Sequence, residues 1–545
     1  MKSVMKHSFS HVPQANIQRS TFKRVHGHKT TFDSGKLVPI YVDEALPGDS
    51  FNMNATFFVR MMSALEVPVM DNMFLDVFYF AVPMRLVWEN FTKFMGERPN
   101  PGVTGVYDPT DYIIPQVVSP SGGFAIGGVS DYFGLPTVDS QNGAMSGNTI
   151  SVSSLWHRGY NLIYNEWFRD QNLIDSVTVD TDDGPDTLAD YDTVLRRAKR
   201  HDYFTSALPW PQKGPGVSIE LTGNAPVVGI GITKNDQTFG SNPTVIETGG
   251  AEVTYAEARA ASSNLAFYVE GTNSGASTGI PSIYADLTDV SAATINSLRE
   301  SFQLQKLYER DARGGSRYTE IVRSHFGVIS PDARLQRPEY LGGGTSQIMV
   351  NPVQKNATVP DGSGGLSSIA GDLSAYATAT SRNGFTKSFT EHSLIFGIIC
   401  VRADLTYQQG IPRMFSRSTR WDFYWPALAH LGEQEILNKE IYAQGDSNDD
   451  DVFGYQERWA EYRYAQSKIT GKLRSTYSTP LDVWHLSQEF TSLPTLSEAF
   501  IEENPPVQRI IAVTSEPEFV FDSYFKCITA RPMPTYSVPG QIDRF

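Results

Sequence analysis

The segment "MDNMFLDVFYFAVPMRLVWENF", Met70–Phe91, decides the fold of this chain. From Met73 to Val82 almost every position is apolar, and Asp76 is the lone charge. Side chains of a β-strand alternate between its two faces, so a strand that is apolar on both faces must be covered on both. We expect the second sheet of a sandwich to cover one face. We expect inserted helices, beginning with residues 85–94, or a neighbouring subunit to cover the other. Pro83 then ends the strand pairing.

Further strand-like segments cluster towards the two ends of the chain, at residues 37–42, 51–61, 393–407, 509–513 and 519–530. No regular alternation of strands and helices links them, which argues against a doubly wound α/β sheet. The pattern favours an antiparallel sandwich in which the first and last strands pair and the middle of the chain forms insertions. Helical periodicity predicts helices within residues 84–97, 153–173, 291–315 and 316–326.

The charge of the chain is uneven. Its net charge of −15 argues against a protein whose whole surface binds nucleic acid. The first 36 residues, however, carry only one acidic residue, Asp33, against Lys36 and six further cations. Those six are predicted to contact phosphates of nucleic acid: Lys2, Lys6, Arg19, Lys23, Arg24 and Lys29. Residues 1–36 are thus predicted to form a basic arm, which either binds DNA or laces neighbouring subunits together, or does both.

Two regions stand out by composition. Residues 216–289 are rich in Gly, Ser, Thr, Ala and Asn and contain only Lys234 and Arg259 as basic residues. They are predicted to form a surface insertion, either a decorative loop or an exposed binding module. Residues 361–384 have low-complexity character and are predicted to form a mobile loop.

A hydrolase motif is the first catalytic alternative. A Gly-Asp-Ser turn ends at Ser50, and a late Asp-x-x-His segment supplies Asp482 and His485. Such residues form the triad of some serine hydrolases, in which the histidine takes the hydroxyl proton. Here the turn lies between two predicted strands, where Pro-Gly-Asp is ordinary turn chemistry, so the motif is a weak match.

A metal site is a second alternative. Asp446, Asn448 and Asp450 have the spacing of a calcium loop, but the central glycine and the final glutamate of such a loop are missing. A solvated acidic loop is the default interpretation. We predict no cofactor.

The cysteines, Cys400 and Cys527, lie in apolar segments and are predicted to be reduced core thiols. The N-terminus lacks the apolar stretch of a signal peptide, and no apolar run approaches the roughly 20 residues of a transmembrane helix. The sequence predicts no membrane insertion.

Six long blocks, read in order, carry a family resemblance. They are "RSTFKRVHGHKTTFDSGKLVPIYVDEALPGDSF" (19–51), "YNLIYNEWFRDQNL" (160–173), "HDYFTSALPWPQKG" (201–214), "ERDARGGSRYTEIVRSHFGVISPDARLQRPEYLGG" (309–343), "ERWAEYRYAQSKITGKLRS" (457–475) and "RPMPTYSVPGQIDRF" (531–545). The series resembles the major capsid proteins of the Microviridae, small single-stranded DNA phages, and within them the gokushovirus branch. The resemblance weakens through residues 216–289.

The resemblance implies a mainly β fold, an eight-stranded antiparallel jelly-roll sandwich over residues 37–545 with long inserted loops and several helices. It implies a homo-oligomeric T=1 icosahedral shell around circular single-stranded DNA, assembled in the cytoplasm of a host bacterium as part of the virion. In that branch a variable insertion, here 216–289, forms threefold protrusions, for which we expect a host surface receptor. A separate small basic protein neutralises most of the DNA charge, and no catalytic residues are implied.

Between subunits, we expect ion pairs from an arginine-rich stretch that also carries Glu309, Asp311, Glu320, Asp332 and Glu339. Its cations are Arg310, Arg313, Arg317, Arg334 and Arg337. The alternative from another class is a jelly-roll carbohydrate-binding or adhesion module that forms no shell.

Overall fold

The computed structural model describes residues 18–97, 112–137, 148–217, 295–360 and 366–536, and four short strands between 217 and 295. Lys2 and Lys6 therefore lie outside the described residues, as does most of the predicted insertion. The chain divides into two compact units, residues 212–311 and the remainder, and the sheets discussed here belong to the larger one.

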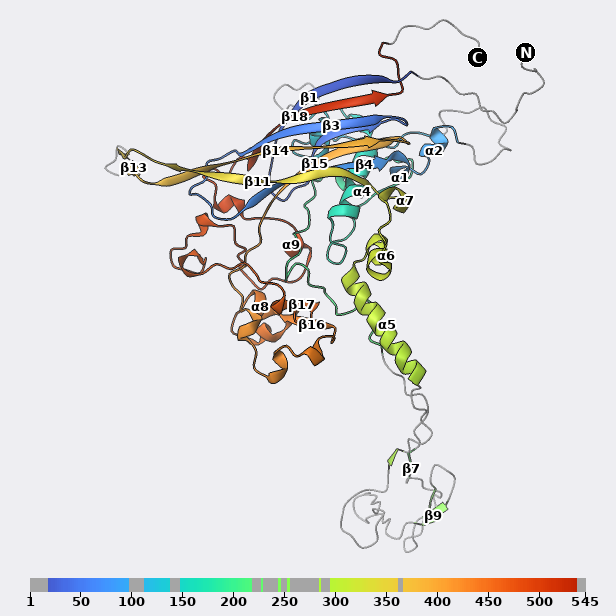
Figure 1. Cartoon of the computed structure of the whole chain (residues 1–545), viewed down its shortest axis with the longest axis vertical. Coiled ribbons are helices and arrows are strands. Elements are labelled where there is room, and N and C mark those ends of the chain that lie inside the picture. The colour runs from blue at the N-terminus through green and yellow to red at the C-terminus, as the bar shows by residue number, and fades with distance from the viewer. Residues whose placement is uncertain are drawn as a thin grey trace, which may run out of the picture. The chain divides into compact units, whose positions relative to one another are not determined.

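Eight long strands form the centre of the larger unit (Figure 1). They are β1 (Ser20–Phe32), β2 (Val38–Ala45), β3 (Ser50–Met61), β4 (Met73–Pro83), β11 (Glu339–Gln354), β14 (Leu373–Ser388), β15 (Ser393–Ala403) and β18 (Phe519–Arg531). Every neighbouring pair is antiparallel, in the order β1-β18-β3-β14-β11-β4-β15-β2.

Strand β11 turns the corner between two sheets. Its first part, Glu339–Ile348, pairs with β4, and its last part, Met349–Gln354, pairs with β14. The eight strands thereby divide into the sheets β1-β18-β3-β14 and β11-β4-β15-β2. Two four-stranded sheets joined in this order are the arrangement of a jelly roll, which confirms the predicted fold class.

Strand β4 is buried on both faces, as its sequence predicts. Met73, Leu75, Val77, Tyr79 and Ala81 belong to the core between the two sheets. Residues of the opposite face, Phe80 and Val82, belong to a second core on the other side of the sheet β11-β4-β15-β2. The sandwich thus covers one face and inserted elements cover the other.

The second core is built from helices that follow β4 in the chain. The predicted helix 84–97 forms two short helices, α1 (Met84–Val87) and α2 (Phe91–Phe94). It breaks at Trp88, whose backbone is extended and whose buried indole N–H donates to Asp183 Oδ1 at 2.6 Å. The helix predicted within 153–173 begins as α4 (Leu155–Ile163) and ends in a π-helical turn.

A buried ion pair ties this layer together. The Arg158 side chain is 0% exposed and its Nη2 lies 2.6 Å from Asp186 Oδ1. Arg158 Nη1 also donates to the Val87 carbonyl at the end of α1, at 3.0 Å. A buried charge is stable only when it is paired and hydrogen-bonded, and Arg158 meets both conditions.

The remaining elements are short, apart from α5 and α6. These two helices lie where the sequence predicted helices. The helices are α3 (Val129–Tyr132), α5 (Ile295–Gly314), α6 (Tyr318–Phe326), α7 (Asp332–Leu335), α8 (Asn438–Ile441) and α9 (Glu498–Ile501). The two-stranded pairs are β5 (Gln116–Val118) with β6 (Ser151–Ser153), β7 (Val227–Val228) with β10 (Tyr284–Ala285), β8 (Thr244–Ile246) with β9 (Glu252–Thr254), β12 (Val359–Pro360) with β13 (Leu366–Ser368), and β16 (Glu433–Leu437) with β17 (Val452–Glu457). No helix in the described ranges is long and apolar enough to span a membrane.

Two of the predicted segments form strands instead. Thirteen of the 36 residues of the predicted basic arm, Ser20–Phe32, form β1, an edge strand paired along its whole length with β18. The predicted mobile loop 361–384 contributes Leu373–Gly384 to β14. There, small inward residues such as Ala375, Ala377 and Ala379 alternate with polar ones, a period of two that the low-complexity composition concealed.

Candidate functional site

The outer face of the sheet β1-β18-β3-β14 is exposed to solvent. Strand β3 illustrates the alternation: Phe57 and Val59 are fully buried in the core between the sheets, whereas Thr56, Phe58 and Arg60 point outwards and are exposed. The same alternation runs through β18, where Phe525 is buried and Tyr524 is exposed. This face is therefore open to bind a partner, in contrast to the doubly covered sheet behind it.

The charge of this face is positive. Asp522 is the sole acidic residue of its four strands, although the whole chain has 60 acidic residues against 45 Lys and Arg. Five cations from four strands are exposed on it, and we call these residues the basic sheet face: Lys23, Lys29, Arg60, Arg382 and Lys526. A cluster of cations on an otherwise acidic protein is the electrostatic footprint of a nucleic-acid site.

Aromatic side chains lie among these cations. Tyr524 is 54% exposed and Phe58 is 45% exposed. A shallow hollow of about 440 Å³ is lined in part by Lys29, Phe58 and Arg60. Exposed rings stack on unpaired bases while cations neutralise phosphates, so this combination suits a single strand of nucleic acid.

The described cations of the predicted basic arm point to different sides of β1. Lys23 and Lys29 point outwards from β1 and belong to the basic sheet face, whereas Arg24 points to the other side. Arg24 Nη1 and Nη2 donate to the two carboxylate oxygens of Asp43, at 2.6 and 2.8 Å. Arg24 thus joins β1 to β2, at the edge where the two sheets meet, and its contact with DNA stays a prediction. Arg19 is exposed and donates to Ser50 Oγ at 3.2 Å.

Sequence reasoning missed Arg60, Arg382 and Lys526. They lie on three strands that are far apart in the chain, and only the sheet brings them together. The available signal was the alternation within each strand, which places each of the three at an outward position.

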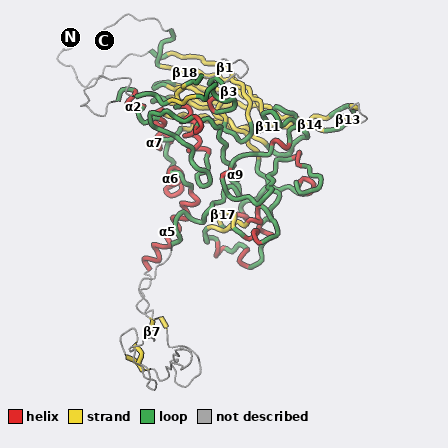
Figure 2. The backbone as a smooth tube through the Cα atoms, turned by 180° about the vertical axis from the view of Figure 1, so that it is seen from behind, coloured by secondary structure: helices red, strands yellow, loops and turns green. Residues whose placement is uncertain are grey.

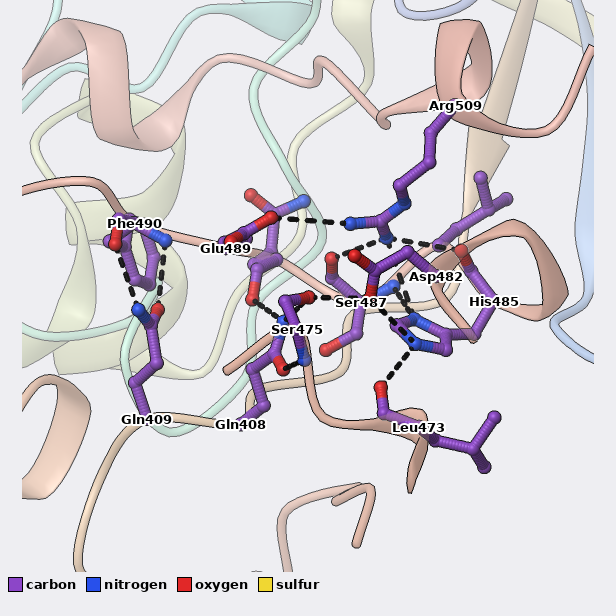
Figure 3. Close-up of polar contacts among 12 residues, drawn as sticks. Gln408, Gln409, Leu473, Ser475, Asp482, His485, Ser487, Glu489, Phe490 and Arg509 are labelled. Carbon is purple, nitrogen blue, oxygen red and sulfur yellow. Dashed lines mark hydrogen bonds and ion pairs between the residues drawn. The ribbon is translucent and has the colours of Figure 1, made fainter. Parts of the chain in front are cut away.

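The predicted hydrolase triad is not assembled. Ser50 opens β3, and its hydroxyl contacts Ser388 Oγ at 2.8 Å and accepts from Arg19. The hydroxyl that reaches Asp482 is that of Ser475, which donates to Oδ1 at 2.7 Å (Figure 3). Neither serine is positioned to pass a proton to His485.

His485 is a structural residue. Its ring is 2% exposed, and Nε2–H donates to the Leu473 carbonyl at 2.6 Å. Nδ1 accepts from the backbone N–H of Ser487 at 3.2 Å (Figure 3). With both ring nitrogens engaged by the backbone, His485 is not available as a general base.

The oxygens of the acidic loop form hydrogen bonds and an ion pair with nearby residues of the chain. Asp446 accepts from the backbone N–H of Asn448 at 3.0 Å, and the Asn448 carbonyl accepts from Asn438. Asp450 pairs with Lys439 Nζ at 2.6 Å. Across the described part of the chain, no group of three or more His, Cys, Asp or Glu side chains could hold a metal ion.

Three of the five arginines of the arginine-rich stretch pair within the chain. Arg313 pairs with Glu433 and donates to Gln456 Oε1 at 2.7 Å. Arg317 Nη2 donates to the Arg169 carbonyl at 2.7 Å, and Arg337 pairs with Asp332 at 2.7 Å. Arg310 and Arg334 are exposed. Contacts between subunits by these arginines stay a prediction.

Both cysteines are free and fully buried, as their apolar surroundings predicted. Burial raises the pKa of the Cys400 thiol to about 12, so it stays protonated near neutral pH.

Comparisons with known proteins show the family of the chain. Residues 10–541 match the family model described as "Capsid protein (F protein)". The chain is 45% identical to the capsid protein VP1 of Bdellovibrio phage phiMH2K, over 99% of this chain and 98% of that protein. It is 43% identical to the VP1 of Chlamydia phage 1, with the same coverage, and 35% identical to the VP1 of Spiroplasma virus 4, over 98% of this chain and 97% of that protein.

Proposed function

The chain belongs to the F protein family of capsid proteins, and we propose that it assembles with copies of itself into a T=1 icosahedral shell around circular single-stranded DNA. Membership of a capsid family makes it a structural component of a virion and not an enzyme. This sets aside the hydrolase and free adhesion-module alternatives.

The basic sheet face carries the DNA part of the proposal. In it, Lys29, Arg60 and Lys526 are exposed beside the rings of Phe58 and Tyr524. In an assembled shell this face points inwards, towards the genome. Phosphates then meet its cations, and unpaired bases stack on its rings.

The remaining charge of the genome needs another source of cations. The chain carries a net charge of −15, so five exposed cations on one face leave most phosphates unneutralised. We expect Lys2 and Lys6 to add to the face, and a separate small basic viral protein to supply most of the positive charge. Assembly then takes place in the cytoplasm of the host bacterium.

Residues 216–289 form the host-attachment part of the proposal, as threefold protrusions on the outside of the shell that bind a surface receptor. Their polar composition and their place within a separate compact unit support an insertion that can change without disturbing the sheets. Deletion of 216–289 should leave shells intact and abolish adsorption to the host. Shells that adsorb normally after the deletion would refute this part.

The content of purified particles tests the proposal. After nuclease treatment of the exterior, nucleic acid extracted from the particles should resist exonuclease and be degraded by a single-strand endonuclease. These are the properties of circular single-stranded DNA. Particles that contain double-stranded or no nucleic acid, or protein that remains monomeric, would contradict it.

A further inference from the structure

A two-stranded ribbon extends from the sheet β1-β18-β3-β14. It consists of Met349–Gln354 of β11 and Leu373–Thr378 of β14, paired in antiparallel register. The pairing of β4 with β11 ends at Ile348, and that of β3 with β14 begins at Thr378. Figures 1 and 2 show the two strands continuing together past the other long strands towards β12 and β13. We call these two segments the ribbon.

One face of the ribbon is covered in part by the chain itself. Ala375 and Ala377 are buried, and the backbone N–H of Leu65 donates to the Ala375 carbonyl at 2.9 Å. Val350, opposite Ala377 in the register, packs against the core between the sheets. The inner face is thus covered at Val350, Ala375 and Ala377, whereas Pro352 and Leu373, farther along the same face, are exposed.

The outer face carries three exposed large hydrophobic side chains, each opposite a small or polar partner: Thr378, Asn351 and Ser374. Met349 and Val353 of β11 share this face with Tyr376 of β14, because directly opposed residues point to the same side. Met349 is 66% exposed, Tyr376 52% and Val353 45%. Three large apolar side chains on one narrow ribbon exceed the scattered single residues that a soluble surface usually carries.

The ribbon also lacks charge. Its segments, "MVNPVQ" and "LSAYAT", contain no Asp, Glu, Lys or Arg, whereas such residues make up 19% of the chain. The basic sheet face ends where the ribbon begins, since Arg60 lies opposite Thr378. Nucleic acid needs cations, so the ribbon is not a continuation of that site.

Leu65 forms an antiparallel bridge with Ala375 at one edge of the ribbon, and at Met349–Gln354 no further strand is paired with the β11 edge in the described part of the chain. Exposed strands that stay in solvent normally carry charges or bulges that prevent association with other chains. An uncharged ribbon with three large hydrophobic side chains exposed on its outer face is therefore built to be covered by protein.

We infer that the outer face of the ribbon, Met349, Val353 and Tyr376, packs against a second copy of this chain. This inference rests on the proposed self-assembly and adds to it a specific contact. In a closed shell every copy presents the same surfaces to its neighbours, so an apolar element that projects from each copy meets another copy wherever the shell closes. Burial of these side chains then contributes to assembly and not to the folding of one chain.

Glutamate substitutions test the contact. Met349→Glu and Tyr376→Glu place a charge that the packed face cannot accommodate, and each should lower the yield of closed particles at least ten-fold. Because both side chains are exposed in the single chain, the thermal midpoint of the unassembled protein should not change. The matched controls Met349→Leu and Tyr376→Phe keep the apolar surface and should assemble as the unmodified chain does. Normal particle yield from both glutamate variants, with the unmodified chain assembling, would overturn the ribbon contact and leave self-assembly standing. An unmodified chain that forms no particles would overturn both.

Crosslinking identifies the partner. A Val353→Cys variant carrying a thiol-linked benzophenone should yield a product of two capsid chains in particles, and not in unassembled protein at the same concentration. The native thiols, Cys400 and Cys527, are 0% exposed and will not compete for the reagent. Crosslinks only within one chain, to DNA or to a different polypeptide would refute the second copy as the partner.

Discussion

The Asp76 carboxylate lies 3.0 Å from Nε of Arg402, across the pairing of β4 with β15. Both side chains are nearly buried, at 6% and 3% exposure. Arg197 Nη1 reaches the same carboxylate oxygen at 2.7 Å. Asp76, the lone charge of the apolar strand in the sheet that is covered on both faces, thus pairs with two arginines.

Asp76→Ala should destabilise the chain strongly. It leaves Arg402 and Arg197 in a buried site without their anion, which typically costs about 3–5 kcal/mol. Denaturant unfolding of the unassembled chain measures the loss. Asp522→Ala, at an exposed position, should change the free energy of unfolding by less than about 0.5 kcal/mol. Equal losses from the two variants would contradict the buried anchor.

Two phenylalanines distinguish the stability of the fold from the proposed binding of DNA. Phe80 is 0% exposed and packs against Trp167 and Phe168, with ring centroids 5.4 and 5.8 Å away. Phe80→Ala should cost about 3–5 kcal/mol in unfolding experiments. Phe58→Ala removes an exposed ring and should weaken single-stranded DNA binding with little change in stability. A large stability loss at Phe58 would mean that this face is covered.

His157 predicts how stability depends on pH. Burial lowers the pKa of its imidazole to about 4, while Asp192 and Asp186 oppose the effect. Because the unfolded chain binds the proton more readily, stability should fall by up to about 3 kcal/mol as pH falls from about 6.5 towards 4. His157→Gln should remove most of this slope, and the exposed His201→Gln should not. An unchanged slope in His157→Gln would assign the effect to other groups.

The basic sheet face predicts a salt effect. Lys29→Gln combined with Lys526→Gln removes two phosphate contacts, so the slope of log K against log salt for a single-stranded oligonucleotide should fall by about 1.4. Arg24 points to the opposite side of β1 from Lys29. Arg24→Gln should therefore leave this slope unchanged, while it removes the ion pair that joins β1 to Asp43. Equal slopes for the double variant and the unmodified chain would remove this face from the DNA site.

The fold could be predicted from the sequence where burial imposes a pattern. Residues 73–83 are apolar on both faces. A strand with this pattern is not stable with a face exposed to solvent, so the sequence predicted a covering layer on each side. Strand β1 could not be predicted in this way. It is an edge strand with one exposed face, and its lysines and histidines are as typical of a free basic arm as of a strand.

The basic sheet face was predictable only in part, for a geometrical reason. Lys23 and Lys29 stand out because they belong to a local cluster of charge. Arg60, Arg382 and Lys526 are single cations in separate segments, and their proximity depends on strand register across hundreds of residues. The ion pairs of Arg313 and Arg337 were suggested by local charge, but the sequence does not reveal that these partners lie within the same chain.

A reconstruction of particles formed by the purified chain tests the central claim most directly. The account predicts a closed icosahedral shell in which the basic sheet face, including Lys29, Arg60 and Lys526, lines the interior against density for nucleic acid. A shell with that face turned outwards, or a chain that stays monomeric under assembly conditions, would contradict it.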